Sequence, residues 1–270
     1  MAKKHINICT AVIYTNLNHP NSDSKKTWDD ESNEDKINLI ERILEELKQD
    51  TDLLILPAGF LDTRTNKPKT KYTIYGKMIA NLINKHNSKL VICVGVDGRN
   101  SADQLAVAVD KKGIISAARK FYDEGGWVNL AKTAFEKEDG LERTFTINKK
   151  KAYVAVCWDA KGIYRNNIAK HECDFLINVI HGFGKTTSRE DSQFVRKIMA
   201  GAAKYWRVHL YAASTFFDDR PHGNWPSGIK WTHGEKSVND FTYKDISIKP
   251  ESENSINTNL GKIYLSYYYE

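Results

Sequence analysis

Short apolar runs that alternate with amphipathic helical segments constrain the fold of this chain more than any other feature. Runs with the length and composition of buried strands occur at residues 6–14, 52–57, 90–96, 152–157, 175–180 and 210–214. Helices are predicted over residues 35–49, 72–86 and 189–209, the last with a capping box at residues 188 and 191. Hairpins are predicted over residues 105–118 and 145–157, and further strands over residues 228–231 and 241–248. This order predicts one α/β (α+β) domain over residues 1–270, with helices outside stacked sheets.

The composition argues against several classes of protein. Hydrophobic residues make up 41% of the chain and charged residues 27%, which is typical of a globular protein with a core. The net charge of +6 is spread over scattered lysines, so no nucleic-acid partner is expected. No run has the length of a membrane span, and the first residues lack a signal-peptide pattern.

The four cysteines are widely spaced and favour a reducing, cytoplasmic compartment. They are Cys9, Cys93, Cys157 and Cys173. The chain has no Cys-x-x-Cys pair and no Cys/His spacing of the kind that zinc requires, so no metal site is expected.

Cys157 is the most informative of these residues. The apolar run that begins at Ala152 ends abruptly in Cys157, Trp158 and Asp159. A strand end holds a side chain rigidly at the rim of a sheet, and the N–H groups of the following turn can face a substrate. That position suits a nucleophilic thiol. Taken alone, however, a cysteine in a strand is more often a structural residue of the core.

Two further segments indicate a function only in combination with Cys157. A hairpin delivers Lys120 just past its second strand, where an ammonium group can stabilise an oxyanion; taken alone, Lys120 is a surface lysine. A short strand ends at Pro57 and is followed by Ala58, Gly59 and Phe60, which alone indicate only a turn.

In combination these segments resemble the nitrilase (carbon–nitrogen hydrolase) superfamily. Pro57, then Arg119–Lys120, then Cys157–Trp158–Asp159 occur in the order and approximate spacing of that family's motifs. Segments 140–145, 173–178, 202–214 and 224–228 resemble other parts of the family pattern, so the likeness spans residues 5 to 248. It implies a four-layer α–β–β–α sandwich that forms homodimers or larger homo-oligomers. It also implies a small-molecule substrate and no cofactor.

The resemblance also implies roles for individual residues. Cys157 attacks an amide or nitrile carbon, and Lys120 with the N–H of Trp158 holds the developing charge. Residues predicted to line the substrate pocket are Trp158, His181, Phe183 and Phe60. A second glutamate often assists in the loop after the lysine, and Glu136 is the first candidate for it, with Glu124 behind it.

The chain departs from the family at Ala58, the position of the glutamate that serves as general base. A positioned general base contributes about 10²–10⁴-fold in rate. Asp62, Asp159, Glu124 and Glu136 are alternatives by chain order. Three explanations stay open: a natural relative with a different base, a relative that binds without turnover, or an engineered replacement of the glutamate. The predicted function is hydrolysis of a small amide or related C–N bond. The alternative is a catalytically impaired or non-catalytic binding protein.

Two other segments have patterns that bear on function and assembly. Residues 179–186 follow a strand and resemble a phosphate-binding loop, but Val179 stands where that loop needs glycine, which disfavours a nucleotide-hydrolysing function. The aromatic tail at residues 262–269 is predicted to be an exposed or partner-covered strand, with residues 264–269 as a candidate interface.

Overall fold

The computed structural model describes residues 5–17, 27–63, 68–98, 102–182, 194–217, 225–234 and 237–270. In chain order the strands are β1 (Asn7–Tyr14), β2 (Leu53–Ile55), β3 (Leu61–Asp62), β4 (Val91–Asp97), β5 (Gln104–Asp110), β6 (Gly113–Arg119), β7 (Thr144–Ile147), β8 (Lys150–Val156), β9 (Phe175–Val179), β10 (His209–Phe216), β11 (Gly228–Ile229), β12 (Ser252–Thr258) and β13 (Gly261–Tyr269). The helices are η1 (Trp28–Asp30), α1 (Asn33–Glu46), α2 (Pro68–His86), α3 (Asp159–Arg165), α5 (Ala200–Trp206) and α6 (Tyr243–Ile246).

Strand β1 joins the two halves of the fold. Residues 8–10 pair in parallel with β2, and residues 12–14 pair in parallel with β10. From β2 the strand order continues through β4 and β5 to β6, and from β10 it continues through β9 and β8 to β7. Because β8 contacts β5 and β6, and β9 contacts β4, the two halves face each other as stacked sheets.

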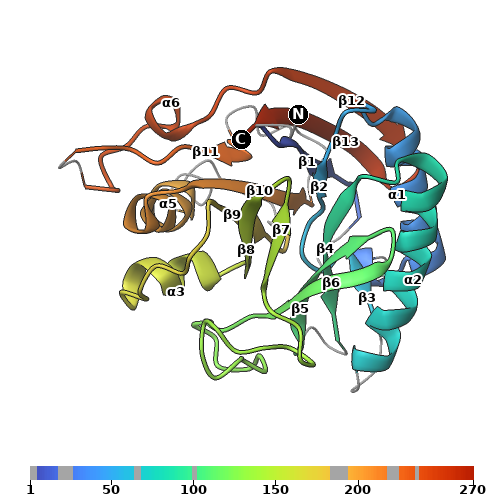
Figure 1. Ribbon diagram of the computed structural model, residues 1–270, viewed down its shortest axis with the longest axis horizontal. Helices are drawn as coiled ribbons and strands as arrows, with labels where there is room; N and C mark the ends of the chain where they lie inside the picture. Colours follow the sequence, from blue (N-terminus) through green and yellow to red (C-terminus); the bar gives the residue numbers. More distant parts are fainter. Residues whose placement is uncertain are drawn as a thin grey trace.

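The alternation of side chains along the strands builds two cores. Ile8, Ile55 and Cys93 lie in the core between the sheets, whereas Cys9 and Leu54 lie in the core beneath α1 and α2. Figure 1 shows α1 and α2 on one side of the sheets, and α3 and α5 on the other. The predicted four-layer α–β–β–α arrangement is confirmed.

Helix α1 follows its predicted pattern. The Ser32 hydroxyl accepts a hydrogen bond from the Asp35 N–H at 3.0 Å, which caps the first turn. The apolar positions Ile37, Ile40 and Ile43 are buried against the sheet. Both predicted hairpins are present as β5–β6 and β7–β8.

The prediction for residues 189–209 is correct only in part. A π-helical segment, Phe194–Met199, leads into α5, and Arg207 ends the helix with a left-handed φ of 55°. The chain then enters β10 at His209, earlier than predicted. The predicted capping box at residues 188 and 191 lies outside the described residues.

One prediction for the last part of the chain is wrong, and a second is correct only in that the tail forms a strand. Residues 241–248 were expected to form a strand, but Thr242 and Asp245 form a capping box that starts α6. The tail was expected to be an exposed or partner-covered strand. Instead, β13 lies between β1 and β12 and pairs antiparallel with both, and Leu265 and Tyr268 are buried. Within the described residues, no helix is both long enough and apolar enough to cross a membrane.

The fold brings several strand ends together. The parallel strands β2 and β4 end at one edge of the first sheet, and the parallel strands β8 and β9 end at one edge of the second. The residues that follow these ends meet between the sheets, where the Ala58 N–H donates to the Ile180 carbonyl at 3.1 Å. Chemistry-bearing side chains from both sheets are therefore neighbours there.

Candidate active site

Cys157 occupies a sharp turn between β8 and α3. Its φ is +51°, in the left-handed region that few residues other than glycine adopt, and its N–H donates to the Val179 carbonyl at 2.7 Å. A strained residue at a strand-to-helix turn is a frequent feature of functional sites. The turn holds the thiol rigidly at the end of the strand.

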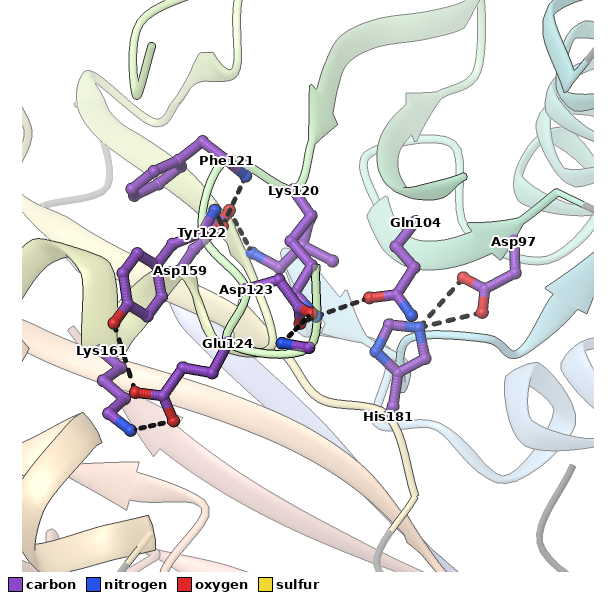
Figure 2. A network of polar contacts seen from close by, with 12 residues as sticks. Asp97, Gln104, Lys120, Phe121, Tyr122, Asp123, Glu124, Asp159, Lys161 and His181 are labelled. Carbon is purple, nitrogen blue, oxygen red and sulfur yellow. Dashed lines mark hydrogen bonds and ion pairs between the residues drawn. The ribbon is translucent and has the colours of Figure 1, made fainter. Parts of the chain in front are cut away.

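Asp159 ties the neighbouring loop to this turn. One carboxylate oxygen accepts hydrogen bonds from the N–H groups of Phe121 at 2.7 Å and Tyr122 at 3.1 Å. The other accepts from the Val156 N–H at 3.0 Å. Figure 2 shows Asp159 with Phe121 and Tyr122. Burial raises the pKa of Asp159, and these N–H groups act in the opposite direction. Because Asp159 is fully engaged, it is not available as the alternative base.

Lys120 immediately precedes the loop that Asp159 holds. Its ammonium is buried and donates to Gln104 Oε1 at 2.8 Å and Asp123 Oδ1 at 2.6 Å. Burial of Asp123 acts to raise the pKa of this carboxyl, but the hydrogen bond and charge of Lys120 outweigh it, and the pKa is lowered. Lys120 is therefore fixed as a buried cation whose hydrogen-bond partners include Asp123 and Gln104.

His181 lies two residues beyond the end of β9. Its Nε2 contacts both carboxylate oxygens of Asp97, the last residue of β4, at 2.9 and 3.1 Å (Figure 2). Burial of His181 acts to lower its pKa, but Asp97 and Cys157 outweigh burial and raise it to about 10. The ring is therefore an imidazolium at neutral pH.

The thiol of Cys157 differs from the other three thiols in the direction in which its pKa is shifted. Burial acts to raise the pKa of Cys157, but the charge of Lys120 and the side chain and backbone of His181 lower it below its usual value. Burial raises the pKa of Cys93 to about 12 and that of Cys173 to about 11, and it also raises the pKa of Cys9. Since the thiolate is the nucleophile, Cys157 has the environment of a reactive cysteine.

Ala58 lies beside the imidazole–carboxylate pair. It is buried, and a side chain added at the neighbouring Gly59 would lie 3.2 Å from both Asp97 Oδ2 and the His181 ring. Gly59 also has a φ of +60°, which favours glycine.

The remaining predicted substrate-binding residues have different surroundings. Trp158 is half-buried at the start of α3, with Lys161 Nζ 4.6 Å from its ring centroid. Phe60 is fully buried in the core beneath α1 and α2, where its ring meets that of Trp28 edge-on. Its side chain packs inside this core, and its predicted place in a substrate pocket stays a prediction. Phe183 lies outside the described residues.

Two of the predicted acidic candidates are engaged elsewhere, and a third lies next to Asp97. Glu136 accepts a hydrogen bond from the Lys132 N–H within its own loop. The groups that lower the pKa of Cys157 against its burial are Lys120 and His181. Glu124 forms an ion pair with Lys161. Asp62 lies opposite Asp97 where β3 pairs with β4.

Asp97 was missed by the sequence reasoning. A signal was present, since an apolar strand ends at Asp97–Gly98. Its partner, however, is 84 positions away in the chain. Within the described residues, no group of three or more His, Cys, Asp or Glu side chains is arranged to hold a metal ion.

Several solved structures with a similar fold are proteins of the nitrilase superfamily. Nit3 from Saccharomyces cerevisiae, a member of branch 10 of the superfamily, is 14% identical over 99% of this chain and 92% of its own, with a TM-score of 0.53. A carbon–nitrogen hydrolase from Helicobacter pylori G27 is 15% identical over 97% and 89% of the two chains, with a TM-score of 0.52.

A third similar structure carries a modified active site. It is a CN-hydrolase superfamily protein from Xanthomonas campestris with an arsenic adduct in its active site, 14% identical over 79% of this chain and 77% of its own, with a TM-score of 0.52. No protein-family model and no curated protein sequence matches this chain. The protein therefore has the nitrilase fold, as predicted.

Proposed function

We propose that this protein hydrolyses a carbon–nitrogen bond of a small amide or related molecule, with Cys157 as nucleophile and a thioester acyl-enzyme as intermediate. The observation that carries the proposal is the Cys157 thiol, held in a left-handed turn with its pKa lowered by Lys120 and His181. Its fold is that of proteins that include carbon–nitrogen hydrolases.

The surrounding residues suit the charge changes of this reaction. As the thiolate attacks, negative charge develops on the substrate oxygen. The buried ammonium of Lys120 and the backbone N–H of Trp158, in the turn after Cys157, are the groups proposed to stabilise it. Asp159 fixes the loop of Lys120 to the turn of Cys157, so the two groups keep their relative positions.

A panel of small aliphatic and aromatic amides tests the proposal. We expect release of ammonia or amine from at least one member, and loss of that release after the protein is alkylated with iodoacetamide. The alkylated protein serves as the matched blank because only the thiols are changed. Absence of release from every amide, although Cys157 is readily alkylated, would contradict turnover.

The alternative is a catalytically impaired or non-catalytic binding protein on the same fold. Ala58 is the observation that favours it, because the carboxylate of the family's general base is missing there. The Ala58→Glu variant separates the two functions. Hydrolysis that appears only in this variant would support the binding protein, and hydrolysis by the unmodified chain would contradict it.

A further inference from the structure

The place of the missing glutamate adjoins a histidine–carboxylate pair that links the two sheets. The Ala58 N–H bonds to the carbonyl of Ile180, which directly precedes His181. Asp97 comes from the other sheet and meets the imidazole at 2.9 Å. The groups next to position 58 that can transfer a proton therefore include His181 and Asp97.

We propose that His181 is the general base and general acid of this site, in place of the glutamate absent at position 58, and that Asp97 is its positioning residue. The inference rests on the proposed function. It assigns the order of contacts Asp97–His181–Cys157, in which the imidazole stands between a carboxylate and a thiol.

The geometry of the ring supports this order. The bond to Asp97 uses Nε2 and places a proton there, so in the neutral ring Nδ1 is the nitrogen that can accept a proton. Nδ1 is buried and has no hydrogen-bond partner among the described residues. Cys157 and His181 follow the ends of the paired strands β8 and β9, and the Cys157 N–H bonds to the carbonyl of Val179, two residues before His181. His181 also contributes to lowering the pKa of the Cys157 thiol. A buried nitrogen without a partner beside a thiol is poised to exchange a proton with it.

Lys120 and Asp123 do not fill the role. The ammonium of Lys120 is a donor without an acceptor site, and it is already bonded to Gln104 and Asp123. The two carboxylate oxygens of Asp123 accept from Lys120 and from the Gly125 N–H at 2.9 Å. Lys120 and Asp123 are therefore bonded to each other, and neither is available to exchange a proton with the substrate.

The proton transfers balance with water as the only co-reactant. The Cys157 thiolate forms a C–S bond to the amide carbon, and the C=O electron pair moves to oxygen. When that pair returns, the C–N bond breaks and Nδ1 of His181 gives its proton to the leaving nitrogen. A water then attacks the thioester and transfers a proton to Nδ1. The C–S bond breaks, the acid is released, and the thiolate–imidazolium pair is restored.

Other charged groups also face this pair. Burial, with a smaller contribution from the nearby carboxylates of Asp97 and Asp62, raises the pKa of Asp29 in η1 to about 6. Lys120 acts on Cys157 from the opposite sheet. In the pH profile of kcat/KM, ionisation of Asp29 therefore contributes to the acidic limb. Deprotonation of the His181 imidazolium sets the alkaline limb.

The His181→Ala variant tests the inference without depending on turnover. An ordinary thiol is only a few per cent ionised at pH 7, and the lowered pKa of Cys157 gives it a larger thiolate fraction than an ordinary thiol. Loss of the imidazolium removes this support. At pH 7 we expect iodoacetamide to alkylate Cys157 about tenfold more slowly, and hydrolysis of a responsive amide to fall by roughly 10²–10⁴-fold.

The Asp97→Asn variant supplies a second, nearly isosteric test. Asparagine still accepts a hydrogen bond but lacks the charge that raises the His181 pKa, so the upper limb of the pH profile of kcat/KM moves to lower pH. His209→Ala is the matched control, because His209 also pairs with a carboxylate, Glu270, at 2.8 Å but is not among the groups placed at Cys157. Its profiles are expected to stay unchanged.

Unchanged alkylation of Cys157 in His181→Ala would overturn the inference. So would unchanged hydrolysis by this variant, and in that case the proposed function would stand because the native chain still turns over. An unmoved upper limb in Asp97→Asn would overturn the positioning role. Failure of the native chain to hydrolyse any amide, with the alkylation difference intact, would instead contradict the proposed function and leave the His181–Cys157 proton exchange supported.

Discussion

Replacement of Cys157 by serine is expected to lower the hydrolysis of any responsive amide by roughly 10⁴-fold or more, because the ionised thiol is the atom that attacks. A serine hydroxyl has nearly the same shape, but its pKa is so high that neither Lys120 nor His181 ionises it at neutral pH. The variant therefore removes nucleophilicity while leaving the turn and its hydrogen bonds in place. Steady-state release of amine measures the effect.

Cys173→Ser is the matched control for this variant. Both thiols have an exposed fraction of 7%, but burial raises the pKa of Cys173, whereas the pKa of Cys157 is lowered. We expect Cys173→Ser to keep the native turnover. Equal loss in the two variants would mean that thiol removal acts on the fold, and full activity of Cys157→Ser would remove Cys157 from the mechanism.

Replacement of Asp159 by alanine is expected to lower the free energy of unfolding by about 3–5 kcal/mol, as removal of one partner of a buried ion pair does. Arg143 donates to Asp159 Oδ2 at 3.2 Å, and the two side chains are 2% and 0% exposed. Without the carboxylate, the Arg143 charge and the N–H groups of Phe121 and Tyr122 lose an acceptor. Urea unfolding measures the change.

The control for that experiment is Asp174→Ala. Asp174 is exposed and accepts a single hydrogen bond, from the Lys151 N–H at 2.7 Å, so its removal is expected to cost about 1 kcal/mol or less. A loss for Asp159→Ala no larger than this control would show that the buried carboxylate does not hold the loop of Lys120 to the turn of Cys157.

The fold was predictable because its strands and helices carry their own local patterns. Continuous apolar runs predicted β1, β4, β8, β9 and β10. The order of weak motifs predicted that the ends of β2, β6 and β8 belong to one site. Burial and packing follow from these runs, since each can lose its contact with water only against another layer.

The errors have physical causes. Residues 241–248 look strand-like in composition, but the side chains of Thr242 and Asp245 compete with sheet hydrogen bonds and start a helix. The aromatic tail has the alternation of a half-exposed strand, and nothing local in it indicates that β1 and β12 cover its edges.

The candidate site was predictable only in part for the same reason. Cys157 and Lys120 follow strand ends that the sequence marks, and His181 was expected to line the pocket. The bond between His181 and Asp97 joins ends of strands in different sheets, so no spacing in the chain indicates it. The sequence shows that the glutamate of the family pattern is replaced by Ala58. Only the tertiary fold shows which groups surround that position.

The most direct test of the central claim is mass spectrometry of the chain after acid quenching during hydrolysis of a responsive amide. If Cys157 is the nucleophile, one acyl group adds to the chain, and peptide mapping places it on Cys157. The adduct is absent from Cys157→Ser. Hydrolysis that proceeds with an acyl group on another residue, or with none under conditions where deacylation is slowed by His181→Ala, would contradict the account.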